Sequence, residues 1–268
     1  MTELYFMNNA GHDQMMGFIV RSGDRTVIID GGTEADADNL LLFLKKTGAK
    51  KVDAWFITHP HNDHYGAYQR LSEENRLPEI EKMYVSLTTN EYLDSKKGLI
   101  APEEDKEARI FNALKKPALH DLKKGEHFVF GDIKIDILRV FNPDITVDFG
   151  NNASVVMKVR DKKSVLILAD LGIEAGDEVM KMYSPDELDA DYVQMAHHGQ
   201  DGVRKAFYEY IKPKACLWAA PIWLWNNDVG NGFDSANFQT VRTREWIEKI
   251  GTAKEHIKEY DGPHRIEL

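Results

Sequence analysis

The chain of 268 residues is long enough for one large α/β domain or two small ones, and its 43% hydrophobic content can fill a sizeable core. Its formal net charge of -10, from 34 basic and 44 acidic residues, argues against a large basic surface of the kind that binds duplex phosphates. The single cysteine, Cys216, excludes an internal disulfide and a thiolate-rich zinc site.

No segment of the chain predicts membrane insertion or secretion. The N-terminal residues lack the basic and apolar parts of a secretory signal, and no run of about 18 apolar residues is present. The chain also shows no repeat, no low-complexity tract and no linker between halves. These observations predict a soluble cytoplasmic protein with a single domain over residues 1–268.

Short apolar and β-branched segments recur along the chain and predict strands. They lie at residues 4–7, 17–20, 26–29, 52–58, 82–86, 127–130, 133–140, 154–159, 164–169, 192–196 and 215–220. Helical periodicity falls between them, at residues 35–46, 63–71, 103–114, 173–183, 203–211 and 240–250. Hairpin-like strands followed by alternating strands and helices predict an α/β fold, an αββα sandwich of two mixed β-sheets flanked by helices.

The strand predicted at 52–58 leads directly into a cluster of metal-ligand side chains, with the sequence HPHNDH at residues 59–64. His59 and His61 are two residues apart in extended backbone, so both side chains can point to one side. Asp63 and His64 lie where the chain turns into a helix and can face a second point nearby. Imidazole and carboxylate ligands suit Zn, Mn or Fe, and two ions about 3.5–4 Å apart can hold a bridging hydroxide as the nucleophile.

Three further predicted strands end in polar residues. Asp30 follows one of them, Asp170 the second, and the pair His197 and His198 the third. In an open α/β sheet such strand ends gather along one edge, so these residues can meet the histidine cluster. Asp170 is the best candidate for a carboxylate that bridges two metals, and Asp30 is expected behind them, where it accepts a hydrogen bond from a ligand imidazole.

The sequence at 59–64 fits the pattern H-x-H-x-D-H, and the chain resembles the metallo-β-lactamase superfamily over nearly its whole length. Within that superfamily it is most similar to hydrolase domains of the ComEC type and to phosphorylcholine esterases. The residues that carry this resemblance are DGG at 30–32, THPHNDH at 58–64, NNASVV at 151–156, LILAD at 166–170 and HHG at 197–199.

The resemblance implies one metal on His59 and His61, a second on Asp63 and His64, and Asp170 between them. It also implies that one histidine of the HHG sequence completes the ligand set. We expect His198 as that ligand, and His197 as the group that stabilises an oxyanion or protonates a leaving group. The reverse assignment of these two histidines stays open.

Departures from the wider superfamily bear on the substrate. β-Lactamases, lactonases and glyoxalase II-like enzymes carry a further ligand histidine before the bridging carboxylate, whereas residues 141–153 contain none and hold asparagines, Asn151 and Asn152 among them. The first metal would then be more open to water or a phosphoryl oxygen, which weighs against β-lactams and thioesters.

Sequences of the ComEC type usually continue HHG with a serine, whereas this chain has Gln200 there. Residues 221–238 also look peculiar to this chain, so the resemblance does not imply a particular substrate. Trp223 and Trp225 in that segment suit an aromatic wall of the substrate pocket, with Asn151 and Asn152 as further pocket candidates. The alternative for the two tryptophans is hydrophobic packing beneath a long loop.

These expectations combine into a metal-dependent hydrolase with two divalent ions as cofactors, Zn or Mn, with Fe as a further option. Asp63 and His197 are the expected catalytic residues, because they can manage protons beside the metals. The expected partner is a small-molecule phosphoester substrate, more specifically a phosphodiester, while nucleic acid is disfavoured by the net charge. The alternatives are hydrolysis of a carboxylic ester, lactone or amide, a ComEC-like single-strand nuclease, and a binding protein without turnover.

Overall fold

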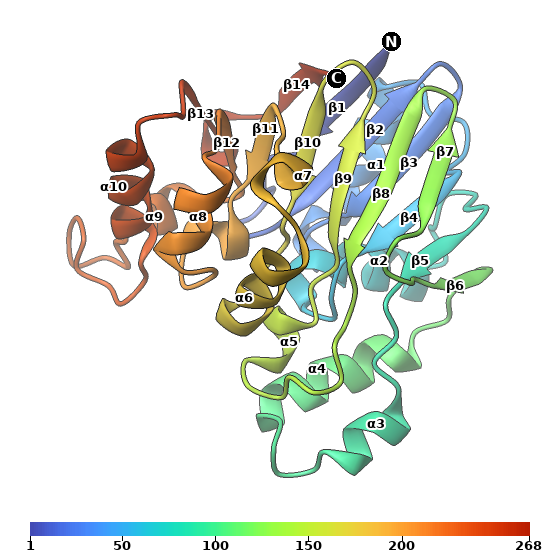
Figure 1. Cartoon of the computed structure of the whole chain (residues 1–268). Helices are drawn as coiled ribbons and strands as arrows, with labels where there is room; N and C mark the ends of the chain where they lie inside the picture. The colour runs from blue at the N-terminus through green and yellow to red at the C-terminus, as the bar shows by residue number, and fades with distance from the viewer.

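A computed structural model describes all 268 residues, which form two seven-stranded sheets packed face to face (Figure 1). The first sheet has the order β14 (His264–Glu267), β1 (Thr2–Phe6), β2 (Gly17–Ser22), β3 (Arg25–Asp30), β4 (Ala54–Ile57), β5 (Met83–Val85) and β6 (Leu119–Asp121). The second has the order β13 (Glu255–Lys258), β12 (Ala215–Trp218), β11 (Tyr192–Gln194), β10 (Ser164–Ile167), β9 (Val156–Arg160), β8 (Ile133–Arg139) and β7 (His127–Phe130).

Both sheets are mixed in the same way. In the first, β14, β1, β2 and β3 are antiparallel, and β3 to β6 are parallel. In the second, β7 to β10 are antiparallel and β10 to β13 are parallel. Each sheet is built from one half of the chain, except that β14 returns to the edge of the first sheet.

Apart from one short helix between the antiparallel strands β8 and β9, the helices lie in connections between parallel strands, and most of them cover the outer faces of the sheets (Figure 1). They are α1 (Ala37–Lys46), α2 (Asn62–Glu73), α3 (Asn90–Ser95), α4 (Pro102–Ala113), α5 (Phe149–Asn152), α6 (Ile173–Met182), α7 (Pro185–Leu188), α8 (Lys205–Ile211), α9 (Ile222–Trp225) and α10 (Thr240–Ile250). Three 3-10 turns are η1 (Glu34–Asp36), η2 (Ala196–Gly199) and η3 (Glu259–Asp261).

Successive side chains along a strand face opposite sides of the sheet, so one set packs in the core between the sheets and the other faces the layers outside them. The central cluster holds 25 buried apolar residues from both sheets. In β8, Ile135 faces this cluster and Asp136 faces outward. In β4, Phe56 faces it too, but Trp55 on the opposite face packs against Tyr68 of α2, with ring centroids 5.3 Å apart. β4 is therefore buried on both faces, as its continuous apolar sequence indicates.

The helices α3 and α4 extend beyond the sheets, at the bottom of Figure 1. A small apolar cluster of Leu93, Ile100, Ala108 and Phe149 joins them to α5. Gly150 of α5 donates its backbone N–H to Glu104 Oε1 of α4 at 3.0 Å. This contact places one side of α4 close to the strand ends.

The predicted sandwich of two mixed sheets flanked by helices is confirmed. Every predicted strand and helix is present, although bounds differ: the apolar run at 52–58 is strand only in β4. The sequence did not predict β6, β13, β14, α3, α5, α7 or α9, because these elements are too short to show a clear periodicity, and neighbouring elements hold them in place.

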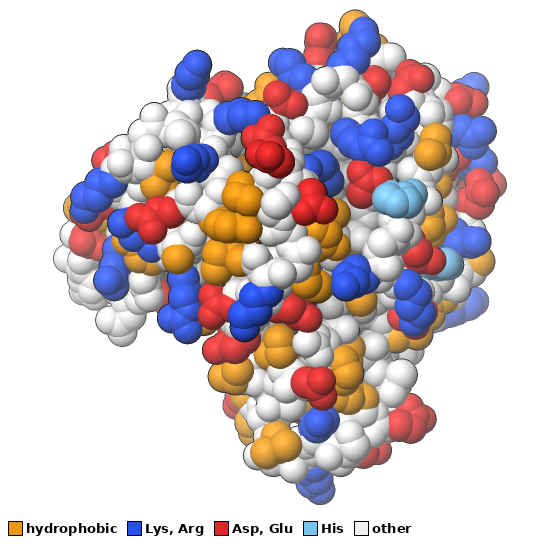
Figure 2. Space-filling view, in the orientation of Figure 1, with side chains coloured by type: hydrophobic (Ala, Val, Ile, Leu, Met, Phe, Trp, Pro, Cys, Tyr) orange, Lys and Arg blue, Asp and Glu red, His pale blue; other side chains and the backbone are white.

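None of the helices has the length and apolar character needed to cross a bilayer. On the face shown in Figure 2, basic and acidic side chains are interspersed and neither sign forms a continuous surface.

Candidate metal centre

The residues singled out in the sequence lie along one edge, where strands of both sheets end. Asp30 ends β3, residues 59–64 follow β4, Asp170 follows β10, and His197 and His198 follow β11. The chain turns sharply at these points, since Asp30, His197 and His198 have φ values of 57°, 48° and 55°. This left-handed conformation is uncommon outside glycine and persists only where the surrounding structure fixes it.

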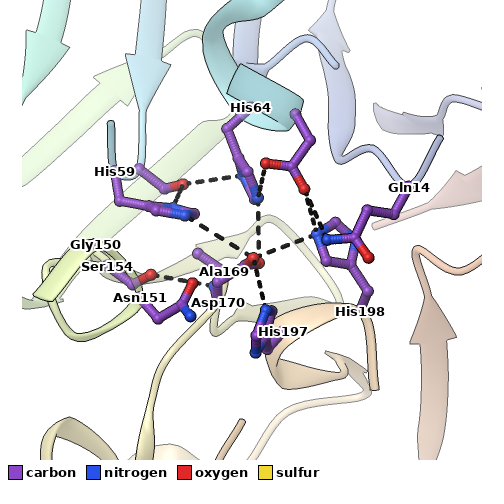
Figure 3. A network of polar contacts seen from close by, with 12 residues as sticks. Gln14, His59, His64, Gly150, Asn151, Ser154, Ala169, Asp170, His197 and His198 are labelled. Carbon is purple, nitrogen blue, oxygen red and sulfur yellow. Dashed lines mark hydrogen bonds and ion pairs between the residues drawn. The ribbon is translucent and has the colours of Figure 1, made fainter. Parts of the chain in front are cut away.

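One ligand group consists of Asp63, His64, Asp170 and His198, whose ligand atoms all lie within 4.8 Å of one another. Asp170 Oδ1 is 3.2 Å from His64 Nε2, and Asp170 Oδ2 is 3.3 Å from His198 Nε2. Asp63 Oδ2 is 3.1 Å from His198 Nε2. Figure 3 shows the side chains of His64, from above, and His198, from the right, directed toward the Asp170 carboxylate.

A second ligand group consists of His59, His61 and Asp170. His59 Nε2 lies 3.9 Å from Asp170 Oδ2, and the rings of His59 and His61 are steeply inclined, with centroids 4.6 Å apart. Asp170 belongs to both groups, so its carboxylate can be shared by two ions.

The Nδ1 atoms of His64 and His198 are hydrogen-bonded to the surrounding scaffold. His64 Nδ1 donates to Asp30 Oδ2 at 2.7 Å, and His198 Nδ1 donates to the backbone oxygen of Ala219 at 2.7 Å. These bonds assign the proton of the neutral ring to Nδ1 and leave the Nε2 lone pair facing Asp170. The tautomers therefore suit metal ligation through Nε2.

Asp30 lies behind both ligand groups and is fully buried. It accepts hydrogen bonds from the backbone N–H and the hydroxyl of Thr58, each at 2.8 Å, in addition to the bond from His64. The Thr58 hydroxyl also lies 3.1 Å from His59 Nδ1. Asp30 thus orients an imidazole of each group, directly in one case and through Thr58 in the other.

The atoms that face the gap between these side chains have no hydrogen-bond partner although they are buried. They are the Nε2 atoms of His59, His64 and His198 and both carboxylate oxygens of Asp170. Buried polar atoms are normally paired, because leaving them unpaired costs free energy. Nitrogen and oxygen donors that converge without pairing with one another fit two divalent transition-metal ions.

The electrostatics of the centre favour positive charge. Burial alone would lower the pKa of His198, but Asp170 and Asp63 raise it to about 10. Burial likewise opposes charge on His64, and the neighbouring carboxylates nevertheless hold its pKa well above its ordinary value. Against the effect of burial, the two imidazoles keep the pKa of Asp170 well below its ordinary value. Cations between these carboxylates would be stabilised in the same way.

The centre opens onto a cavity of about 420 Å³. Its lining is entirely polar and consists of Asp13, Gln14, Thr33, His61, Asn62, Asp63, Glu103, Glu104, Glu107 and His197. Half of these residues are acidic and none is Lys or Arg. A ligand in this cavity would meet the two ligand groups on one side and the acidic side of α4 on another.

His197 differs from His198 in its surroundings. Its side chain is 17% exposed, lines the cavity and has an unpartnered Nδ1, whereas the His198 side chain is fully buried. His197 Nε2 lies 3.9 Å from Asp170 Oδ2. His198 is part of a ligand group and His197 of neither.

The two asparagines take different positions. Asn152 is structural: its amide donates to the backbone of Val147 and to Glu174, and accepts from the N–H of Ala175. Asn151 is also buried, but its Oδ1 has no partner, and Figure 3 shows the side chain beside Asp170. Neither asparagine lines the 420 Å³ cavity.

Trp223 and Trp225 do not line that cavity either. Trp223 packs near Phe238 and donates its Nε1–H to the backbone oxygen of His12 at 2.6 Å. Trp225 meets Trp218 edge to face, with centroids 5.3 Å apart, and lies under the guanidinium of Arg244. The structure thus places both rings in packing positions in place of the predicted pocket wall.

Sequence reasoning missed several residues of the centre. Thr58 could have been found from its position directly before the histidine cluster, and Gln200 from its position directly after HHG. Gln14 and Glu104 gave no local signal, because they reach the centre only through the three-dimensional fold.

Comparison with known proteins gives relatives of limited similarity. ComE operon protein 3 of Bacillus subtilis (strain 168) is 25% identical over 185 residues, which are 68% of this chain but 21% of that protein. The chain therefore spans about a fifth of the length of that relative.

Among solved structures, the metallo-beta-lactamase fold protein YhfI of Bacillus subtilis covers 99% of both chains with a TM-score of 0.57 and 14% identity. A diphosphatase from the PhnP family covers 100% of this chain and 98% of its own, with a TM-score of 0.53 and 12% identity. At such identities these likenesses show the fold alone.

The family model of the metallo-beta-lactamase superfamily matches residues 13–178, more than half of the chain. The matched region contains the candidate ligand residues at 59–64 and Asp170, and it ends before His197. On this match and on the two-sheet fold, the chain belongs to the metallo-beta-lactamase superfamily, whose members are metal-dependent hydrolases.

Proposed function

We propose that the protein is a two-metal hydrolase of a small phosphoester, most simply a phosphodiester. The observation that carries the proposal is that two ligand groups share Asp170 and open onto one cavity. Divalent ions held there, Zn or Mn with Fe as a further option, would polarise phosphoryl oxygens and make a water molecule acidic enough to attack at neutral pH.

The composition of the second ligand group favours a phosphoester over a carbonyl substrate. This group has two imidazoles and one carboxylate, and residues 141–153 supply no third histidine. The polar group near this position is the amide of Asn151, which carries no charge. A site with few protein ligands leaves room for a substrate oxygen. The diphosphatase that shares the fold supports the same choice.

His197 is suited to protonate the leaving group. It lines the cavity and its side chain is partly exposed, so it can reach a substrate that lies beside Asp170. Asp63 also lines the cavity and keeps its carboxylate ionised, since His64 and His198 hold its pKa low in spite of burial. It can therefore accept a hydrogen bond from the attacking water.

The size and charge of the cavity favour a small substrate. Its 420 Å³ falls in the range of small-molecule sites, about 300–1,000 Å³. Its acidic lining offers no cation to hold a second phosphate of a polymer. We therefore propose a small molecule as the substrate, in preference to a nucleic acid.

An activity panel tests this proposal. The purified protein, loaded with Mn(II) or Zn(II), is assayed with bis-p-nitrophenyl phosphate, p-nitrophenyl phosphate, p-nitrophenyl acetate and a lactone. We expect the fastest turnover with the phosphodiester, and a loss of at least about 100-fold in Asp170→Asn with the fold retained. Faster turnover of the acetate or the lactone would replace the phosphoester by a carbonyl substrate.

A further inference from the structure

We propose that Gln14 is a positioning residue that fixes the Asp63 carboxylate beside the metal centre, and that Gln200 holds Gln14 in place. This inference rests on the metal centre proposed above, but not on the identity of the substrate. Gln14 Nε2 donates to Asp63 Oδ2 at 3.0 Å, and Gln200 Nε2 donates to Gln14 Oε1 at 2.9 Å. Figure 3 shows the Gln14 amide reaching into the centre.

The bond from Gln200 decides which way the Gln14 amide faces. A glutamine side chain has one acceptor end and one donor end. Because Gln200 donates to the oxygen of Gln14, the NH₂ group of Gln14 is turned toward Asp63. Gln200 is 7% exposed and directly follows the HHG sequence. A buried residue two positions after His198 therefore sets the orientation of the Gln14 amide.

Asp63 needs such support more than the two histidines of its own group do. His64 is held by Asp30, and His198 by the backbone of Ala219. The side chains of these histidines are fully buried, whereas that of Asp63 is 17% exposed. Outside the ligand group, the one hydrogen bond to the Asp63 carboxylate comes from Gln14. Without it, the carboxylate could rotate into the cavity.

The backbone around Gln14 is anchored on both sides. Met16 donates its N–H to the backbone oxygen of Asp63 at 3.1 Å, which places Gln14 two residues away beside the Asp63 side chain. On the other side, Ala10 N–H donates to Asp36 Oδ1 at 2.6 Å, and the His12 oxygen accepts from Trp223. The amide of Gln14 is thus held in position from both ends of its loop.

The first test replaces Gln14 by a residue of similar size without hydrogen-bonding groups. Metal affinity is measured by competition with a chelator, and the Co(II)-loaded protein is examined by visible absorption. In Gln14→Met we expect binding of one of two ions to weaken about 10–100-fold and the Co(II) spectrum to change, as for other partners of metal ligands. Gln69→Met, the same replacement on the far part of α2, is the matched control and should bind both ions as the parent does.

The second test asks whether the two glutamines act together. Gln200→Leu should weaken the same ion less than Gln14→Met, and the double variant should resemble Gln14→Met, because the contribution of Gln200 passes through Gln14. Parent-like affinity and Co(II) spectrum in Gln14→Met would overturn the proposal, as would additive losses. If Gln14→Met fails to fold, unchanged affinity in Gln200→Leu overturns it. Two bound ions without phosphoesterase activity would contradict the proposed function and leave this inference standing.

Discussion

Gly150 lies directly against the ring of His61. A Cβ atom added at this position would overlap His61 Nε2. Gly150→Ala should therefore displace His61 from its group and leave the group of Asp63, His64, Asp170 and His198 intact. We expect elemental analysis to fall from two ions to one per chain and activity to fall about 10–100-fold. Gly176→Ala, which crowds Val203 and no residue of either ligand group, is the control and should keep both ions; two ions in Gly150→Ala would contradict the assignment.

The neighbouring histidines separate metal binding from proton transfer. His198→Ala removes a buried ligand and should lower metal content and activity together. His197→Ala should keep both ions and lower kcat by about 100–10,000-fold, the usual range for loss of a general acid. Metal analysis and steady-state kinetics of the two variants give the answer, and the opposite pattern would exchange their roles.

At this scale, the residues that the sequence singled out as candidate ligands do lie together in the structure, and they could be found because their signals are local. The residues at 59–64 are close in sequence, and Asp170 and the HHG sequence stand at the ends of apolar runs. Gln14 could not be found this way, since its partners Asp63 and Gln200 lie 49 and 186 residues away. For the tryptophans the local signal was misleading. The composition of the segment around Trp223 and Trp225 suited a pocket wall, but Trp225 packs against Trp218.

At the scale of elements, α4 presents carboxylates to the cavity. Glu103, Glu104 and Glu107 line the cavity, and like charges repel an anionic substrate. Replacing Glu103 and Glu107 together by Gln should raise kcat/KM for bis-p-nitrophenyl phosphate roughly 2–5-fold at low salt, with the gain shrinking at high salt through screening. Glu91→Gln on α3 is the control. A gain independent of salt would argue against an electrostatic cause.

The turn η3 carries a buried carboxyl whose protonation affects stability. Burial raises the pKa of Glu259 from 4.5 to about 8; Oε1 accepts from the N–H of Asn9, and Oε2 has no partner. The folded-state pKa lies above that of the unfolded chain, so the stability from this group is present below pH 4.5 and is lost as the pH rises through 8.

Glu259→Gln should remove the pH dependence of stability that this carboxyl causes, which amounts to about 1.4 kcal/mol for each unit of pKa shift. The melting temperatures of parent and variant are measured with EDTA at pH 5.5 and 8.5. Relative to the parent, the melting temperature of the variant should be higher at pH 8.5 than at pH 5.5. Glu248→Gln, an exposed change on α10, should follow the parent at both pH values. Parallel curves for Glu259→Gln and the parent would show that the carboxyl is ionised throughout.

The elements themselves were predictable to different degrees. β4 and β10 are apolar enough to be seen in the sequence, and the outward polar residues of β8 give a clear alternation. By contrast, β6 and β14 have three and four residues, of which only Ile266 is buried, and pairing with β5 and β1 holds them as strands.

At the scale of the whole molecule, the net charge of -10 and the acidic cavity oppose polyanion binding. Single-stranded DNA should bind more weakly than about 10 μM at physiological salt, and its affinity should change little between 50 and 200 mM salt, because few Lys or Arg contacts release counterions. Fluorescence anisotropy with a labelled oligonucleotide measures both. Nanomolar binding with a steep salt slope would favour a nuclease of the ComEC type.

The strand β14 sets the order in which this molecule can be completed during synthesis. β14 pairs with β1, with Glu267 opposite Glu3 and His264 opposite Phe6, although the two strands stand at opposite ends of the sequence. At about 5–20 residues per second, roughly 13–50 s pass on the ribosome between them. Throughout that interval the outer edge of β1 has unpaired N–H and C=O groups, the kind of edge that recruits other strands. Pairing with β14 covers this edge, so a molecule in which β14 is detached would offer β1 to the strands of other molecules.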